Sequence, residues 1–268
     1  MHLPNLKRMS ALRPSRFGVV VAALLLAIGE RLICVAAPAD NPECTIAYLD
    51  KCGQYIFLWT TSLNEVMAPA NTEQLKEHCE RQAASEDCVR KRSEKCHSSV
   101  KKGLSRLFYD AIHEEYEQRC DPESDYHASY LRMAPCIHKI SSDMYNCSAR
   151  LIASIRSSME DDHGKSVRER IPRACCNFVS YTRCAEVAAR KTCDEDTVNF
   201  VKQYLERISG ELFSLACGSY SVEAEVCKKF QTGLLTSHED VKLTDESSVT
   251  TMIGALSTLA NSFQPARR

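Results

Sequence analysis

The sequence of 268 residues lacks the short motifs that carry the common catalytic chemistries. It has no G-x-S-x-G elbow and no Walker or Rossmann glycine pattern, and nine glycines leave little material for one. No C-x-x-C or H-E-x-x-H pair is present to hold a metal ion. We therefore predict no catalytic, cofactor-binding or metal-ligating residue, and we expect a protein that is not an enzyme.

Beyond the N-terminus, the sequence has no apolar run long enough to span a bilayer. Basic residues precede the apolar run Phe17–Ile28, and small residues follow it at Val35-Ala36-Ala37-Pro38-Ala39. This order is typical of a secretory signal peptide, and the run is shorter than the roughly 20 residues that a membrane helix needs. We interpret residues 1–39 as a signal peptide cleaved within 36–39, with an uncleaved anchor as the alternative. The expected location is secreted and extracellular, with no membrane span in the mature chain.

A strong excess of either charge is also missing. Removing residues 1–39 takes away five of the 34 basic and one of the 35 acidic residues, which leaves 29 against 34 and a formal charge of −5. A mildly acidic chain without a basic stripe argues against a nucleic-acid partner. The leader also contains Cys34, so fourteen of the 15 cysteines remain. An even number in a secreted chain predicts disulfides rather than free thiols.

What the sequence does contain is an internal cysteine repeat. Successive cysteines of the first series are 8, 27, 9, 8 and 24 residues apart, and those of the second series are 11, 28, 9, 9 and 24 apart. This agreement predicts a tandem duplication, with modules at 40–130 and 131–230 joined by a connection at 121–135. The two series are Cys44, Cys52, Cys79, Cys88, Cys96, Cys120 and Cys136, Cys147, Cys175, Cys184, Cys193, Cys217.

Two further cysteines, Cys176 and Cys227, fall outside the repeat. Cys176 is not expected to pair with its neighbour Cys175, because adjacent Cα atoms lie about 3.8 Å apart and disulfides usually need roughly 4.4 Å or more. We therefore predict a Cys176–Cys227 disulfide. Six cysteines in a module allow about 15 pairings, among which the spacing does not choose. Corresponding cysteines of the two modules are expected to pair alike.

Apolar residues recur with the period of an α-helix, which predicts an all-α fold of two tandem six-cysteine helical modules stapled by disulfides. In the first module the pattern predicts helices from Leu49 to Val66, ended by Met67-Ala68-Pro69, and from Ser98 to Arg119. In the second module it predicts helices from Ile140 to Met159 and from Asp194 to Ala216, with Asp194 as a cap. The apolar residues of the segment Ser98 to Arg119 are Leu104, Leu107, Phe108, Ala111, Ile112 and Tyr116.

The C-terminal tail, residues 231–268, is rich in Ser and Thr and has no cysteine. Met252, Ile253, Leu256 and Leu259 are spaced for one weak helix, and we expect the ends to be disordered. The chain has one glycosylation sequon, at Asn146, although the half-cystine in its middle makes it a weaker acceptor than usual.

Two functions of different classes fit these features. The first is a non-enzymatic extracellular binding or interaction module, whose partner is an unknown extracellular protein. The second is a carrier of small apolar ligands. A carrier would have a pocket between helices, and a large enclosed apolar cavity would favour it, whereas a filled core with an exposed apolar patch would favour the interaction module. The residues predicted to line a carrier's pocket are Phe57, Trp59, Leu63, Phe108 and Ile112.

The run from Cys175-Cys176 to Cys193 reads C-C-x7-C-x8-C, within repeated helical modules behind a signal peptide. In this it resembles the cysteine-rich secreted proteins of arthropods and nematodes, including the haemolymph-glycoprotein type, whose function is largely unknown. The first module departs from the pattern, with His78-Cys79 in place of the double cysteine. The resemblance implies an extracellular protein and brings no catalytic residues.

Overall fold

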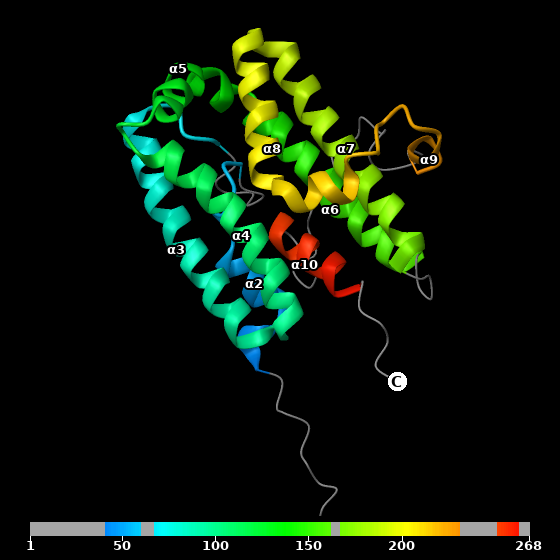
Figure 1. Ribbon diagram of the computed structural model, residues 1–268. Helices are drawn as coiled ribbons and strands as arrows, with labels where there is room; N and C mark the ends of the chain where they lie inside the picture. Colours follow the sequence, from blue (N-terminus) through cyan, green and yellow to red (C-terminus); the bar gives the residue numbers. More distant parts are fainter. Residues whose placement is uncertain (1–40, 60–66, 162–166, 231–250, 263–268) are drawn as a thin grey trace, which may run out of the picture. The chain divides into compact units, whose positions relative to one another are not determined.

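The computed structural model describes residues 41–59, 67–161, 167–230 and 251–262, and these form nine α-helices, one 3-10 helix and no strand (Figure 1). The predicted all-α fold class is confirmed. The described residues from Pro42 onward make one compact unit, and the predicted signal peptide lies outside the described residues. The elements are η1 (Pro42–Cys44), α2 (Ile46–Cys52), α3 (Thr72–Cys96), α4 (Ser99–Cys120), α5 (Asp125–Lys139), α6 (Ser141–Asp161), α7 (Val167–Thr192), α8 (Glu195–Cys217), α9 (Glu225–Lys228) and α10 (Met252–Ser262).

The cysteine repeat is also a repeat of helices. The second cysteine of each module lies on α2 or α6, the third and fourth lie on α3 or α7, and the sixth ends α4 or α8. Equivalent helices join the modules, because α4 packs along α8 and α10 packs against both α2 and α6 (Figure 1). Both modules therefore contribute to one hydrophobic core, in which Ile112 and Tyr204 are almost fully buried.

The first helix of the first module is much shorter than predicted. The pattern predicted a helix from Leu49 to Val66, but α2 ends at Cys52, where the N–H of Gly53 donates to the Leu49 carbonyl. The next segment is not helical, and its residues 56–59 are all buried, which one face of a helix does not allow. The cause is tertiary, since the Leu58 N–H donates to the Tyr204 hydroxyl at 2.7 Å. Residues 60–66 lie outside the described residues.

The predicted connection between the modules is itself largely a helix, α5. Ser124 caps this helix by accepting a hydrogen bond from the Tyr126 N–H at 3.1 Å. The helix runs through Pro135, which the sequence analysis placed in the connection. It buries Tyr130 completely, and the Tyr130 hydroxyl donates to the Pro69 carbonyl at 2.6 Å. The segment between the cysteine series is thus part of the core.

A kink in α8 brings the two modules close together. The predicted cap is confirmed, since Asp194 accepts a hydrogen bond from the Thr197 N–H at 2.9 Å. Gly210, near the end of the helix, has φ +63° and ψ −176°, a conformation that residues with a Cβ rarely adopt. A Cβ at Gly210 would lie 2.8 Å from the Cβ of Ala111 on α4. Glycine at this position therefore allows both the positive φ and the close approach of α8 to α4.

The C-terminal helix is confirmed as α10, but it is not a loose tail. Met252, Ile253 and Ala255 are buried in the common core. Residues 231–250 and 263–268 lie outside the described residues.

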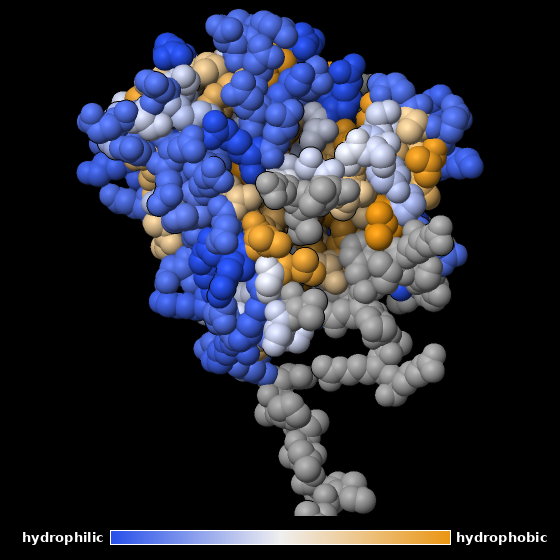
Figure 2. Space-filling model, in the orientation of Figure 1, coloured by the Kyte–Doolittle hydropathy of each residue, from blue (hydrophilic) through white to orange (hydrophobic). Residues whose placement is uncertain are grey.

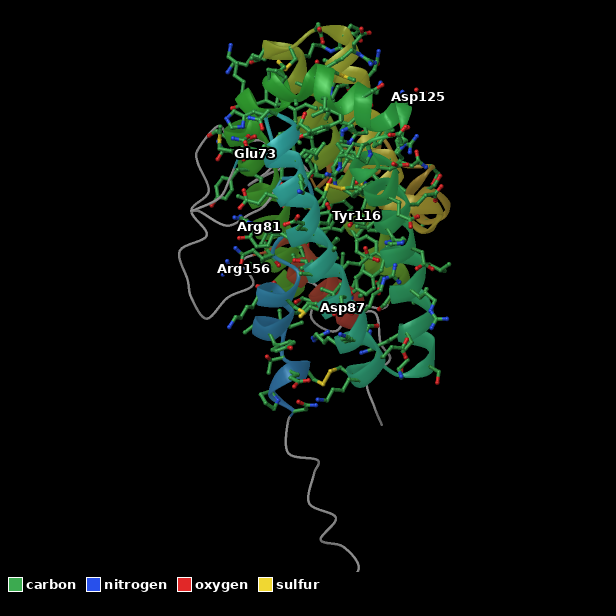
Figure 3. The ribbon with its side chains drawn as sticks, turned by 90° about the vertical axis from the view of Figure 1, so that its left-hand side faces the viewer. Glu73, Arg81, Asp87, Tyr116, Asp125 and Arg156 are labelled. Carbon is green, nitrogen blue, oxygen red and sulfur yellow. A yellow bond between two sulfur atoms is a disulfide. The ribbon has the colours of Figure 1, made fainter. Side chains whose placement is uncertain are left out.

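The first half of α4 leaves apolar surface uncovered. Leu104 and Leu107, which belong to the predicted apolar pattern, are 48% and 60% exposed. Figure 2 shows hydrophobic surface in the middle of one face, over the region where α4, α8 and α10 lie in Figure 1. By contrast, α3 carries a hydrophilic outer face, on which Glu73, Arg81 and Asp87 lie along the helix (Figure 3).

Candidate functional site

The fourteen predicted half-cystines form seven disulfides, all within modules. Corresponding cysteines pair alike, first with fifth, second with fourth and third with sixth, and the predicted Cys176–Cys227 pair is present as well. Such a number of disulfides fits an extracellular protein. The bonds are Cys44–Cys96, Cys52–Cys88, Cys79–Cys120, Cys136–Cys193, Cys147–Cys184, Cys175–Cys217 and Cys176–Cys227.

The double cysteine of the second module fixes two elements to one point of α7. Cys175 is bonded to Cys217 at the end of α8, and Cys176 is bonded to Cys227 on α9. The segment 218–224 between these two anchors is therefore held beside α7 and α8. The first module has one cysteine at this place, so this arrangement belongs to the second module alone among the described residues.

An open groove lies where α7, α8 and the segment 218–224 meet. Its volume is about 650 Å³. Apolar side chains on its lining come from Phe178 on α7 and from Leu205 and Phe213 on α8. The rings of Phe178 and Phe213 are in contact, with centroids 4.7 Å apart, and both side chains remain partly exposed. The groove thus offers an aromatic surface that the core does not fully cover.

Charged groups of both signs surround this apolar surface. Hydrogen bonds from Arg190 and then from Arg183, opposed by partial burial, hold the pKa of Glu186 below its ordinary value, and the charge of Lys202 acts in the same direction. Within the described part of the chain, Lys202 and Glu206 have no ion-pair partner. The groove therefore has an ionised carboxylate, a free cation and a free anion around an apolar centre, which suits a ligand of mixed character.

The kink of α8 is part of the groove, because Gly210 and Ser209 lie on its lining. The same kink leaves the last turns of α8 in contact with α4, where the rings of Phe108 and Phe213 have centroids 6.4 Å apart. A line of aromatic rings therefore runs from α4 through α8 to Phe178 on α7. Sequence reasoning missed this site, although a glycine inside an amphipathic helix is a usable signal of a kink or a close approach.

The residues predicted to line a carrier's pocket belong to the packed core instead. Trp59 and Ile112 are buried, and the Trp59 ring packs edge-on against Tyr204 at a centroid distance of 5.2 Å. Phe57 is buried and contacts Phe108, with centroids 6.5 Å apart. Leu63, the fifth predicted residue, lies outside the described residues. Three of the four described residues are therefore buried core, and Phe108 is partly exposed and packs against it.

Within the described part of the chain, α4 carries a fully buried ion pair. Arg119 and Glu115 have fully buried side chains and are joined at 2.8 Å between Nε and Oε1. Burial alone would lower the pKa of Arg119, but the charge of Glu115 and its hydrogen bond raise it overall. Nη2 of Arg119 also donates to Oε1 of Gln82 at 2.6 Å, and Gln82 in turn donates to the Ile56 carbonyl at 3.1 Å. This network connects α4 to α3 and to the buried segment after α2.

A buried histidine lies beside this network. Burial, followed by the charge of Arg119, lowers the pKa of His78 to about 3, so the imidazole is neutral at physiological pH. Its ring nitrogen Nε2 is buried without a hydrogen-bond partner. Perturbed groups of this kind mark functional sites when they face a cleft. His78 does not line the groove, so we assign the network a structural role.

The predicted glycosylation site lies on α6. Asn146 is partly exposed, whereas the two residues that complete its sequon, Cys147 and Ser148, are buried, and Cys147 is bonded to Cys184. In the folded protein the hydroxyl that the sequon requires is therefore inside the core. Any modification of Asn146 has to precede folding of this helix.

The described part of the chain holds no group of three or more His, Cys, Asp or Glu side chains placed to bind a metal ion. None of its helices combines the length and the apolar character that a bilayer crossing requires. Comparison with protein-family models, with curated proteins and with solved structures finds no match.

Proposed function

We propose that this is a secreted, non-enzymatic binding protein whose α7–α8 groove takes a segment of another extracellular protein. One observation carries the proposal: an open, partly aromatic groove is held between two disulfide anchors, Cys175–Cys217 and Cys176–Cys227, and the first module has no counterpart of the second. Its apolar centre fits an apolar or aromatic side chain, and the charges around it fit polar groups on either side. The resemblance to secreted arthropod and nematode proteins implies an extracellular protein and leaves its activity open.

Openness favours a protein segment over a small apolar ligand. A carrier encloses its ligand and removes most of the ligand's surface from water. This groove is bounded by charged groups such as Arg183, Lys202 and Glu206 and is open to solvent. Of the aromatic residues predicted to line a carrier's pocket, Phe57 and Trp59 are buried in the core and Phe108 packs against it. The carrier therefore remains the alternative that the binding test has to exclude.

The test uses short random peptides displayed on phage and selected on the full secreted protein. The peptides are then measured against the double variant Lys202→Glu with Glu206→Lys, which exchanges two exposed charges of the groove at (i, i+4) spacing. The matched control is Lys76→Glu with Glu80→Lys, the same exchange at the same spacing on the exposed face of α3. Neither change alters net charge, so a difference between them reports on the groove.

Selected peptides are expected to bind the wild type and the α3 control equally and to lose roughly tenfold or more in affinity on the groove variant. An equal loss of peptide affinity on both variants, or no loss on either, would contradict the proposal that peptides bind in the groove. The carrier alternative is tested with the apolar dye N-phenyl-1-naphthylamine. Saturable dye fluorescence that the selected peptides do not displace would favour the carrier.

A further inference from the structure

The exposed leucines of α4 extend the apolar surface of the α7–α8 groove. Ring centroids are 4.7 Å apart between Phe178 and Phe213 and 6.4 Å apart between Phe213 and Phe108, and all three side chains are partly exposed. Leu104 lies one helical turn before Phe108 on the same side of α4, and Leu107 neighbours Leu104 at (i, i+3) spacing. These two leucines are 48% and 60% exposed. One apolar surface therefore continues from α7 across the end of α8 to the first half of α4.

The end of α8 leaves this part of α4 uncovered. The last residue of α8, Cys217, is bonded to Cys175 on α7, so the chain is held at α7 and adds no further turn over α4. Figure 2 shows hydrophobic surface over α4 beside the end of α8, as Figure 1 places these helices. Contiguous apolar surface that remains in water marks a site of interaction.

The spacing of this surface fits an α-helix. Its rings and leucines follow one another at intervals close to the roughly 5.4 Å between successive turns of a helix, so apolar residues at i, i+4, i+7 and i+11 can each meet one of them. An extended segment would bring unpaired backbone N–H and C=O groups onto apolar surface, and the described residues offer no strand edge to pair them. A helix satisfies these groups internally.

Basic residues lie beside the leucines. Residues 99–109 contain Lys101, Lys102 and Arg106 and no acidic residue. Glu94 on α3 is shared by two of these cations, with contacts of 3.2 Å to Lys102 and 3.4 Å to Arg106, and the Arg106 side chain remains 68% exposed. The surface around the leucines therefore has an excess of positive charge, which complements acidic groups on a partner.

We propose that the partner's segment is an amphipathic α-helix of about four turns, roughly 22 Å long, which lies across both modules from the α7–α8 groove to the first half of α4. Its apolar stripe packs on Phe178, Phe213 and the two leucines, and its acidic residues lie beside Arg106. This inference rests on the proposed function, because the groove is one end of the longer surface. It adds the conformation and charge pattern of the partner and a second region of contact.

The test selects phage-displayed peptides of about 18 residues, patterned as amphipathic helices with varied charges, on the full-length protein. Selected peptides are measured against Leu104→Ser with Leu107→Ser, against the groove variant Lys202→Glu with Glu206→Lys, and against the control Met67→Ser. Met67 is 51% exposed and belongs neither to α4 nor to the groove lining. Affinity is expected to fall roughly tenfold or more on the first two variants and to stay unchanged on the control. Binding is also expected to increase the helical circular dichroism of the peptide.

Loss of affinity on the groove variant alone overturns the longer surface and leaves the proposed function standing. Loss on neither variant contradicts the proposed function and the inference together, and binding without a gain of helical signal overturns the helical conformation. Vesicles of phosphatidylcholine and phosphatidylserine test the other class of partner that exposed leucines and cations fit. Vesicle binding that the leucine variant loses while it keeps its peptide affinity overturns the inference in favour of a lipid surface.

A charge exchange keeps the inference falsifiable if the leucine variant misfolds. Arg106→Glu replaces an exposed side chain and is expected to weaken the selected peptides roughly tenfold. Exchanging the acidic residue of the peptide for lysine is expected to restore affinity on this variant and to reduce it on the wild type. Failure of every acidic position to restore binding, with seven disulfides and wild-type circular dichroism in the Arg106→Glu protein, overturns the placement of the partner helix on α4.

Discussion

Replacing Glu115 by glutamine is expected to lower the free energy of unfolding by about 3–5 kcal/mol, because it leaves the Arg119 guanidinium buried without its counter-ion. Both side chains of this pair are fully buried. Nε and Nη2 of Arg119 donate to the two Glu115 oxygens at 2.8 and 3.3 Å, so no solvent is available to replace the lost charge. Arg119→Met is expected to cost a similar amount, since it leaves the carboxylate unpaired.

The double variant Glu115→Leu with Arg119→Met separates this ion pair from simple loss of packing. Apolar residues of similar size often replace a buried ion pair with no loss or with a gain of stability. Here the Oε1 of Gln82 loses its donor, at a cost of about 1–3 kcal/mol. We therefore expect the free energy of unfolding of the double variant to lie within about 2 kcal/mol of the wild-type value. This loss is much smaller than the sum of the losses in the two single variants.

The assay is urea unfolding of the oxidised protein followed by far-ultraviolet circular dichroism. The control is Lys91→Met, which breaks an ion pair of the same (i, i+4) spacing with Asp87 on the exposed face of α3. This change is expected to cost no more than about 0.5 kcal/mol. The explanation would be refuted if either single variant lost no more stability than the control. It would also be refuted if the double variant lost as much stability as the two single variants together.

Three further predictions concern stability and use the same unfolding assay. Gly210→Ala is expected to destabilise the protein by about 1–3 kcal/mol, because it places a Cβ against α4 on a residue with a positive φ. Gly103→Ala, at an open and exposed helical site, is expected to stabilise it by about 0.5–1 kcal/mol. Equal effects of the two changes would contradict the kink at Gly210. Tyr204→Phe leaves the buried Leu58 N–H without an acceptor and is expected to cost about 1–3 kcal/mol; no loss would show that the N–H finds another partner. Burial lowers the pKa of His78 to about 3, so below about pH 6.5 its imidazole takes up a proton in the unfolded chain and not in the folded protein. The free energy of unfolding is therefore expected to fall by about 2 kcal/mol between about pH 7.5 and pH 5. A His78→Asn variant that loses as much stability over this pH range as the wild type would contradict this explanation.

Sequence alone predicts part of the disulfide plan and several of the helices, because these follow from local spacing, but it does not choose the pairing within a module and does not delimit α3 or α7. The two cysteine series imply equivalent pairing, and subtraction leaves Cys176 with Cys227. Helical period likewise predicts α4, α6 and α8, and the cap at Asp194. These features depend on residues close together in the chain or repeated in it.

The remaining features depend on contacts between distant residues. The segment after α2 has helical spacing, but the hydrogen bond from Leu58 to Tyr204, in the other module, favours a non-helical path. The α7–α8 groove is hidden in sequence because Phe178 and Leu205 have the spacing of ordinary core residues. Gly210 and Cys176 are visible in the sequence, but the groove they border forms only when α7, α8 and the segment 218–224 pack together.

The most direct test of the central claim, that one disulfide-stapled helical module has been duplicated, is a disulfide map of the oxidised protein. Peptides from proteolysis without reduction are identified by mass spectrometry. We expect the same first–fifth, second–fourth and third–sixth pairing in both modules, with Cys176 bonded to Cys227. Different pairing in the two modules, or any bond between them, would contradict the duplication as the origin of this fold.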